Sequence, residues 1–222
     1  ALGAKTLVVV DYRADLEAKA LTAWSEALAD RNLGFLFNNR PLYLGTDAND
    51  RLLPALESQG LESLGVLPED RRLRAIGVDA VAEHVGARFV VGNGHSEHLV
   101  ENYMVGGFLL DSGELYFGTR ENKAVIMRGD RPDLQMAALK TPTTCMILTN
   151  GIEPIEYVVN EAELEGVPVM VVDSDTTSTM ERLGNVLDLA RFDHSFKLER
   201  FAEIMRTNVD VDALRAQLQP AE

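Results

Sequence analysis

The sequence has little of several things that would restrict its interpretation. It holds one cysteine, Cys145, so no disulfide can form within the chain, and a buried inert thiol in a reducing compartment is expected. No apolar run approaches the roughly 20 residues of a membrane span, and no basic segment precedes a signal-type apolar core. We therefore expect a cytoplasmic protein with no membrane partner.

Basic residues are also scarce. Lys and Arg number 21 against 35 Asp and Glu, so the formal net charge of the 222-residue chain is −14. Such a charge would repel a phosphate backbone, and nucleic acid is not expected as a partner. Apolar residues make up 46% and charged residues 25%, values that predict a folded globular chain.

Three catalytic signatures are missing: the G-x-S-x-G elbow, the Walker lysine loop and the G-x-G-x-x-G fingerprint. The stretch VGNGHSEH lacks the lysine and the spacing of a phosphate-binding loop. Its His95 and His98 stand three apart without a nearby cysteine or a third placed ligand, which is a weak metal signal. We assign no metal site and no catalytic residue.

What the sequence does have is an alternation of strand-like and helix-like segments. Apolar runs rich in β-branched residues predict strands at 6–10, 33–37, 63–67, 87–91, 123–127, 145–149 and 168–172. Apolar residues spaced three and four apart predict helices at 15–28, 50–59, 78–85, 132–139 and 154–165. This alternation predicts an α/β protein with parallel sheets.

The chain divides into two α/β units and a tail. The stretch PEDRRLRAIG at 68–77 is dense in charge and poor in apolar residues, as expected at a domain boundary. We place the units at 1–72 and 73–194. Residues 195–222 read as amphipathic helices without a strand, and we predict a C-terminal helical extension there.

Polar loops follow three consecutive predicted strands of the second unit: RGDRPD, TNGIEP and DSDTTST. In an open parallel sheet the loops after the strands meet at one edge, where ligands bind. We expect the ligand site at this edge. The candidate ligand-binding residues are Arg128, Gly129, Asp130, Arg131, Thr149, Asn150, Gly151, Asp173, Thr176 and Thr177.

Two arginines in the first loop are unexpected. Gly129 suits a tight turn, Asp130 is a candidate cap, and Pro132 suits a first helical turn, but capping does not require Arg128 or Arg131. A cation near a helix N-terminus is mildly unfavourable unless a negative group lies close. Either an aspartate of a neighbouring loop, Asp173 or Asp175, pairs with Arg131, or Arg131 clamps an anionic ligand with Asp130 as its orienter.

Two other loops have two interpretations each. The hydroxyl groups of Thr176 and Thr177 either cap the last helix of the second unit or hold a phosphate. In the first unit, Asn38, Asn39 and Arg40 of NNRP are candidates for reading a purine base, or they form an ordinary Asn-rich turn.

The residues from about 75 to 190 resemble a DRTGG domain. Asp130-Arg131 lies within NKAVIMRGDRPDLQMAAL, and Thr149-Asn150-Gly151 lies within CMILTNGIEP, with Asn150 in place of the first glycine of Thr-Gly-Gly. The order of strands and helices follows the family. The resemblance implies an accessory regulatory module that self-associates, so we expect a homo-oligomer and most simply a dimer.

The upstream part, from ALGAKTLVVVDYRADLEAKALTAW through FNNRP to SLGVLPEDRRL, resembles the C-terminal half of a dethiobiotin-synthetase-like P-loop NTPase domain. Together the two parts are similar to the N-terminal region of the phosphotransacetylase family. The Walker A lysine loop of that family is not in this sequence, and phosphoryl transfer lacks its cradle without it. We do not expect ATP hydrolysis by this chain.

Three hypotheses remain. The first is a non-catalytic regulatory module that senses a nucleotide or another small anionic metabolite, oligomerises, and acts on a phosphate acetyltransferase or another metabolic enzyme. The second is the larger part of an ATP-dependent dethiobiotin-synthetase-like enzyme. The third is a purely structural dimerisation domain, with Tyr103, Met104 and Phe108 as a candidate apolar face. The cofactor is unknown, with a nucleotide as the candidate.

Overall fold

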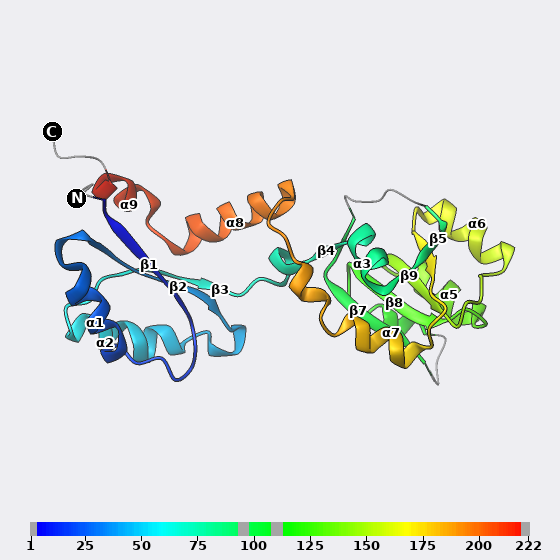
Figure 1. Cartoon of the computed structure of the whole chain (residues 1–222), viewed down its shortest axis with the longest axis horizontal. Helices are drawn as coiled ribbons and strands as arrows, with labels where there is room; N and C mark the ends of the chain where they lie inside the picture. The colour runs from blue at the N-terminus through cyan, green and yellow to red at the C-terminus, as the bar shows by residue number, and fades with distance from the viewer. Residues whose placement is uncertain (1–3, 93–97, 108–112, 219–222) are drawn as a thin grey trace. The chain divides into compact units, whose positions relative to one another are not determined.

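The computed structural model describes residues 4–92, 98–107 and 113–218 (Figure 1). The chain forms two compact units: residues 1–70 together with 195–222 make up unit 1, and residues 71–194 make up unit 2. The residues from 195 onward, which we predicted as a separate extension, thus belong to the first unit.

Unit 1 is built on a three-stranded parallel sheet. Its strands lie in the order β1 (Thr6–Asp11), β2 (Asn32–Arg40), β3 (Ser63–Pro68). Its other elements before residue 70 are α1 (Lys19–Leu28), η1 (Ala29–Arg31), η2 (Leu42–Leu44), the π-helical turn η3 (Ala48–Leu52) and α2 (Leu53–Ser58). All three strands predicted for this part of the sequence are confirmed.

The core of unit 1 lies between its sheet and the helices before residue 70. Phe35 and Phe37 of β2 are fully buried in this core. Leu21, Leu52 and Leu56 of the helical elements are buried in the same cluster. Successive side chains of a strand point to opposite faces, which is why both phenylalanines enter the same layer.

The C-terminal helices α8 (Ser195–Asn208) and α9 (Val211–Leu218) lie on the other side of this sheet from α1 and α2 (Figure 1). Gly65 of β3 forms an isolated antiparallel bridge with Val209. A Cβ at Gly65 would lie only 2.3 Å from the Asn208 carbonyl oxygen, so glycine is required there. Arg200 of α8 also donates to Asp70 at 2.6 Å.

Unit 2 contains a mixed five-stranded sheet. Its strands lie in the order β5 (Arg88–Val91), β10 (Val169–Val171), β9 (Thr143–Thr149), β8 (Lys123–Arg128), β7 (Asn102–Gly106). β8, β9 and β10 are parallel, as predicted, and β7 also pairs in parallel with β8, but β5 runs antiparallel to β10. The sequence did not predict β7 or the short antiparallel pair β4 (Ile76–Gly77) and β6 (Leu99–Val100).

Helices cover both faces of this sheet. The helical elements of unit 2 are η4 (Arg71–Arg74), α3 (Val78–Val85), α4 (Glu114–Phe117), α5 (Pro132–Leu139), α6 (Glu156–Glu165), α7 (Thr176–Leu183) and η5 (Val186–Leu189). Val125 and Met127 of β8 pack with α4, α5 and α6, whereas Ala124 and Ile126 pack with α3 and α7. Burial on both faces explains the near-continuous apolar runs of these strands.

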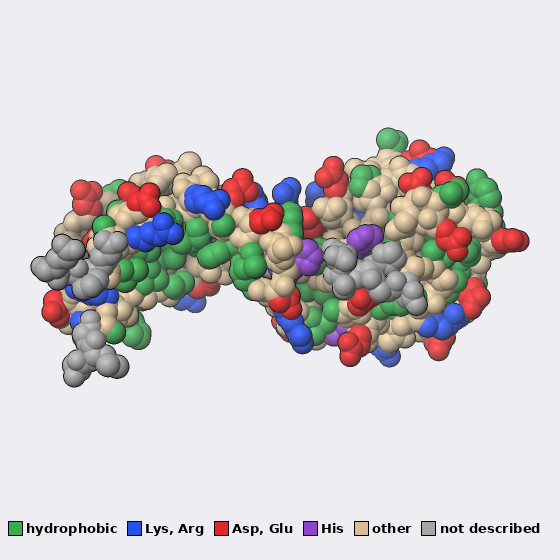
Figure 2. Space-filling view, turned by 90° about the horizontal axis from the view of Figure 1, so that it is seen from above, with side chains coloured by type: hydrophobic (Ala, Val, Ile, Leu, Met, Phe, Trp, Pro, Cys, Tyr) green, Lys and Arg blue, Asp and Glu red, His purple; other side chains and the backbone are tan. Residues whose placement is uncertain are grey.

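Two of the three residues proposed for an apolar dimer face belong to the core. Met104 is 6% exposed, and the Tyr103 hydroxyl group is buried. Phe108 lies outside the described residues. Acidic side chains are scattered over the face of the molecule shown in Figure 2, in keeping with the net charge of −14. Within the described ranges, no helix combines the length and apolarity needed to cross a membrane.

Candidate functional site

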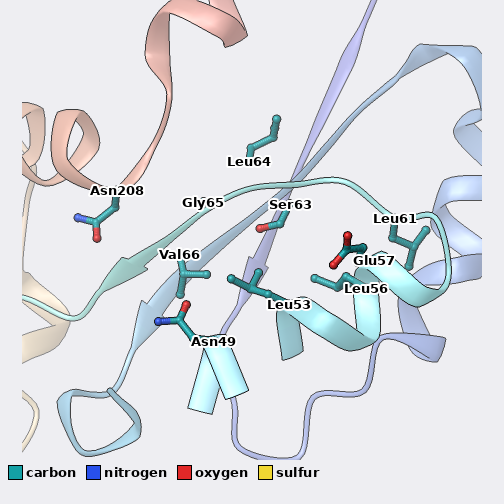
Figure 3. A pocket seen from close by; sticks show the side chains of 10 residues that line it. All are labelled: Asn49, Leu53, Leu56, Glu57, Leu61, Ser63, Leu64, Gly65, Val66 and Asn208. Carbon is teal, nitrogen blue, oxygen red and sulfur yellow. The ribbon is translucent and has the colours of Figure 1, made fainter. Parts of the chain in front are cut away.

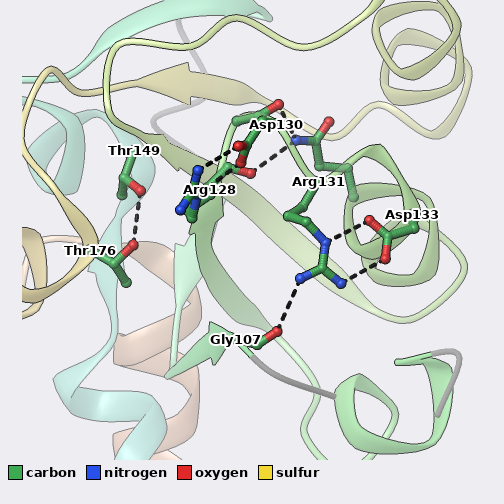
Figure 4. A network of polar contacts seen from close by, with 9 residues as sticks. Gly107, Arg128, Asp130, Arg131, Asp133, Thr149 and Thr176 are labelled. Carbon is green, nitrogen blue, oxygen red and sulfur yellow. Dashed lines mark hydrogen bonds and ion pairs between the residues drawn. The ribbon is translucent and has the colours of Figure 1, made fainter. Parts of the chain in front are cut away.

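The three polar loops of unit 2 meet at the carboxyl edge of its parallel strands, as predicted. Arg128 ends β8 and pairs in register with Thr149, which ends the neighbouring strand β9. The hydroxyl groups of Thr149 and Thr176 share a hydrogen bond of 2.9 Å, which ties the end of β9 to the start of α7 (Figure 4). Thr149 itself is fully buried.

Each arginine of the RGDRPD loop forms a two-pronged ion pair with the aspartate two residues later (Figure 4). Arg128 donates from Nε and Nη2 to Asp130 at 2.9 and 2.5 Å. Arg131 donates from the same two atoms to Asp133 at 2.9 and 2.7 Å. The partner of Arg131 is therefore neither Asp173 nor Asp175, and that prediction was wrong.

These four charges form one exposed cluster. The hydrogen bond from Arg128 lowers the pKa of Asp130, and the hydrogen bond from Arg131 lowers the pKa of Asp133. The charge of Arg131 also acts on Arg128 and on Asp130, so the two pairs influence each other. The arginine side chains are 58% and 37% exposed, and the cluster has no net charge.

Arg131 also reaches the neighbouring strand. Its Nη1 donates to the Gly107 carbonyl oxygen, just after β7, at 3.5 Å (Figure 4). The cluster therefore spans the carboxyl ends of β7 and β8, with the Thr149–Thr176 contact at the end of β9.

The RGDRPD loop lies directly against the following loop and the start of α5. A Cβ at Gly129 would lie 2.0 Å from the Ile152 carbonyl oxygen, so only glycine permits this close approach. Gln135 is fully buried beneath the loop, and its Nε2 donates to the carbonyl oxygens of Arg128 and Gly129 at 3.3 and 2.9 Å. Its Oε1 is buried with no hydrogen-bond partner among the described residues.

Asp130 does not have the roles predicted for it. α5 begins at Pro132, as expected, but its N-cap residue is Arg131 and no side chain caps it. Because Asp130 is hydrogen-bonded to Arg128, it neither caps α5 nor orients Arg131. The sequence also missed Gln135, although a lone amide among the apolar residues of PDLQMAAL was a signal for it.

The Thr149–Gly151 turn holds loops together. Asn150 and Gly151 both have left-handed backbones, with φ of 67° and 66°. Their N–H groups donate to the carbonyl oxygens of Ser174 and Val172, each at 2.9 Å. These amides are thus already engaged by the segment after β10. Asp173 lies beside the turn, since a Cβ at Gly151 would be 3.2 Å from its Oδ1.

Asp175 caps α7. It accepts from the Ser178 N–H at 2.9 Å and from the Ser178 hydroxyl at 3.0 Å, and these bonds lower its pKa. Thr176 contacts Thr149, and Thr177 is exposed on the first turn of the helix.

In unit 1, the NNRP residues lie at the carboxyl edge of the sheet. Asn39 has φ of 58° and donates from Nδ2 to Asp11 at 3.3 Å, and the Asn38 carbonyl oxygen accepts from the Tyr12 N–H. Arg40 has a buried Nη1 with no partner among the described residues. The turn conformation of Asn39 favours the simple turn interpretation for that residue.

Unit 1 also contains a polar network that the sequence did not reveal. The Tyr12 hydroxyl donates to Asp47 at 2.5 Å, and Arg51 donates to Asp47 and to the Leu16 carbonyl oxygen. Burial raises the pKa of Tyr12 to about 12, and the hydrogen bond from Arg51 lowers the pKa of Asp47 to about 2. The spacing of Asp47 and Arg51, four apart, was the available signal.

Two further features lie away from these edges. Lys123 is fully buried at the start of β8 and donates to the Pro142 carbonyl oxygen at 2.8 Å; burial lowers its pKa to about 8. A pocket of about 500 Å³ in unit 1 lies between α2, β3 and Asn208 (Figure 3). In the part of the chain that the structure describes, no group of three acidic, His or Cys side chains is placed to hold a metal; His95 lies outside it.

Comparison with known proteins identifies a family match in unit 2. Residues 80–186 match the family model of the DRTGG domain. This part of the chain is therefore similar to DRTGG domains. The resemblance drawn from Asp130-Arg131 and from the Thr149–Gly151 turn is thus confirmed for this part of the sequence.

A curated relative and a solved structure show more distant similarity. The phosphate acetyltransferase of Nitratidesulfovibrio vulgaris (strain Hildenborough) is 24% identical over 165 residues, which cover 69% of this chain and 23% of that protein. The chain thus spans about a quarter of that relative. The crystal structure of the CBS and DRTGG domains of Clostridium perfringens pyrophosphatase, complexed with its activator diadenosine tetraphosphate, aligns with a TM-score of 0.45 and 11% identity over 84% of this chain and 76% of that one. A likeness at this level transfers nothing about binding.

Proposed function

We propose that this protein is a non-catalytic regulatory module that binds a small phosphate-bearing metabolite or a nucleotide at the carboxyl edge of β7 to β10. The observation that supports the proposal is the pair of exposed arginines, Arg128 and Arg131, each paired with a nearby aspartate on the surface, with one further long bond from Arg131 to the Gly107 carbonyl oxygen. The planar guanidinium fork that binds a carboxylate in this way also matches a phosphate group.

The existing ion pairs do not prevent such binding. Exposed ion pairs contribute at most about 1 kcal/mol, because water and ions compete for the same groups. A phosphate carries more charge than a carboxylate, and the α5 N-terminus next to Arg131 favours an anion. We therefore propose that Arg131 leaves Asp133 for the ligand and serves as the anion clamp.

The sequence similarity supports a proposal for the regulated enzyme. The relative that shares 165 residues with this chain is a phosphate acetyltransferase, and we propose that this chain is a regulatory region or companion of such an enzyme, acting as a dimer. On this proposal, unit 1 is a P-loop NTPase-like part that supports the module without hydrolysing ATP.

One observation favours a different function. Because both arginines are already paired within their own loop, the cluster can be purely structural, in a domain that only mediates assembly. On that alternative, the change Arg131→Ala alters the loop but no ligand affinity.

Thermal unfolding separates the ligand-binding proposal from the structural alternative. The chain is measured with ATP, ADP, AMP, acetyl phosphate and coenzyme A, each with and without Mg²⁺. A ligand at a hundred times its dissociation constant adds about 2.7 kcal/mol, which raises the melting temperature by about 2–4 °C for a chain of this size. We expect such a shift for at least one compound, lost in Arg131→Ala and kept in the control Arg13→Ala. No shift with any compound favours the structural alternative.

A further inference from the structure

The most informative feature of the candidate site is that its aspartates already occupy the positions a ligand would take. Asp130 and Asp133 each offer both carboxylate oxygens to one guanidinium group, in the geometry that a bound carboxylate or phosphate would adopt. Both aspartates lie two residues from their arginine. The site is thus closed by groups of its own chain.

A tethered group is a strong competitor. A side chain attached two residues away acts at an effective concentration of about millimolar or more, whatever the concentration of free ligand. A free carboxylate offers an arginine the same charge and the same fork geometry that the aspartate offers. It therefore gains nothing by exchange and loses its freedom of motion.

A phosphate group differs in charge. Near neutral pH it carries about 1.5 to 2 negative charges and three acceptor oxygens, so it binds a guanidinium group more strongly than a carboxylate does. When it displaces one aspartate, however, that carboxylate stays nearby and repels it.

A ligand with two phosphate groups can bind both arginines, and it therefore competes better with the aspartates than a single phosphate does. Arg128 and Arg131 lie three residues apart on one loop, and each guanidinium group is bound to a carboxylate two residues further along it. Once one phosphate group is bound, the second meets the other arginine as an intramolecular partner.

We infer that Asp130 and Asp133 are built-in competitors for Arg128 and Arg131, and that the site selects ligands with a diphosphate group over carboxylates and single phosphates. This inference rests on the proposed function, since it concerns the ligand class of the same site. Inorganic pyrophosphate is the simplest probe of that class.

Removing a competitor strengthens ligand binding, whereas removing part of a structural ion pair does not. Asp133→Asn and Asp130→Asn keep the size of each side chain and remove its charge. Asp15→Asn is the matched control, because Arg13 and Asp15 form an exposed pair with the same spacing in a strand-end loop of unit 1, at 3.7 Å.

The test is isothermal titration of the full 222-residue chain with pyrophosphate, orthophosphate and succinate, without divalent cations. We expect pyrophosphate to bind about tenfold or more tightly than orthophosphate, and succinate not to bind. Asp133→Asn and Asp130→Asn should each tighten pyrophosphate binding roughly three- to tenfold, on the scale of one exposed ion pair and one removed charge, and Asp15→Asn should leave it unchanged. Both substituted side chains are exposed, and unfolding curves will verify that each variant folds.

Two failures can be told apart. If the wild-type chain binds pyrophosphate but neither Asn variant binds it more tightly, or if succinate binds as well as pyrophosphate, the built-in competition is refuted and the anion site stands. If neither the wild type nor any variant binds a phosphate compound, the proposed function itself fails.

Discussion

The two units use the same chemical pair, an arginine with a two-pronged bond to an aspartate, in two different settings. In unit 1, Asp47 is 25% exposed, and it accepts from the buried Tyr12 as well as from Arg51. In unit 2, Asp130 and Asp133 are 42% and 61% exposed.

The setting decides the role of the pair. Arg51 and Arg131 are similarly exposed, at 39% and 37%, and each also donates to a backbone carbonyl oxygen. The Arg51 pair differs because its aspartate also accepts from the buried Tyr12. Breaking a partly buried network leaves polar groups without partners, which is costly, whereas an exposed pair exchanges its partner for water or a ligand at little cost. We therefore interpret the unit 1 pair as structural and the unit 2 pairs as exchangeable.

The largest effect is expected from breaking the contact that shapes the unit 2 edge. Gly129→Ala places a Cβ 2.0 Å from the Ile152 carbonyl oxygen, so the two loops must move apart. We expect the free energy of unfolding to fall by about 3 kcal/mol, measured by urea denaturation. Gly107→Ala, where a Cβ meets nothing within 4 Å, is the control. Equal stability of Gly129→Ala and the wild type would refute the close approach.

Lys123 is a fully buried basic residue that is bonded to a backbone carbonyl oxygen rather than to an aspartate. Because the pKa of Lys123 is about 8 in the folded chain and 10.5 in the unfolded chain, the unfolded state binds more protons between these values. Stability should rise with pH across this window, by about 3 kcal/mol. Lys123→Met should lose this rise, and Lys140→Met, which removes an exposed lysine, should keep it. Identical alkaline profiles of Lys123→Met and the wild type would contradict this account.

A smaller effect tests whether the unit 1 network is structural. Tyr12→Phe removes the hydroxyl that donates to Asp47, and the loss should be about 1 kcal/mol, as for one buried hydrogen bond. Asp133→Asn should leave the melting temperature almost unchanged. Tyr43→Phe, at a tyrosine that is 82% exposed, is the matched control. If Asp133→Asn destabilised the chain as much as Tyr12→Phe, the distinction between the two settings would be lost.

The smallest effect is expected on the stability of the fold at acidic pH. Asp47 has a pKa of about 2 in the folded chain against 3.8 in the unfolded chain. The contribution of Asp47 to the free energy of unfolding is fully present above its pKa in the unfolded chain. This contribution is lost as the pH falls from about 4 to about 2. Asp47→Asn should show a shallower loss of stability over this range in urea denaturation. The same slope in the variant and the wild type would argue against the network.

Much of the fold follows from the sequence because its signals are local. The helices at 78–85 and 132–139 have the predicted bounds, since Gly77 and Pro132 stand where such helices begin. The three site loops were predicted to meet because carboxyl ends of parallel strands share an edge. Strand direction carries no such signal, and β5 was therefore wrongly expected to be parallel.

The parts that the sequence missed depend on side-chain direction. Arg131 had candidate aspartates at 130, 133, 173 and 175, and nothing in their order shows which carboxylate the guanidinium faces. Tyr12 and Asp47 are 35 residues apart, so only the folded chain brings them together. Gln135 was predicted as part of a helix, but its two bonds to the RGDRPD loop depend on how that loop turns back over α5.

We propose that the exposed arginines of unit 2 exchange their aspartates for a phosphate ligand. The most direct measurement is the binding of pyrophosphate to Arg131→Ala, compared with the wild type and with Arg13→Ala. We expect saturable binding that is lost in Arg131→Ala and unchanged in Arg13→Ala. Equal affinity in all three proteins would contradict it.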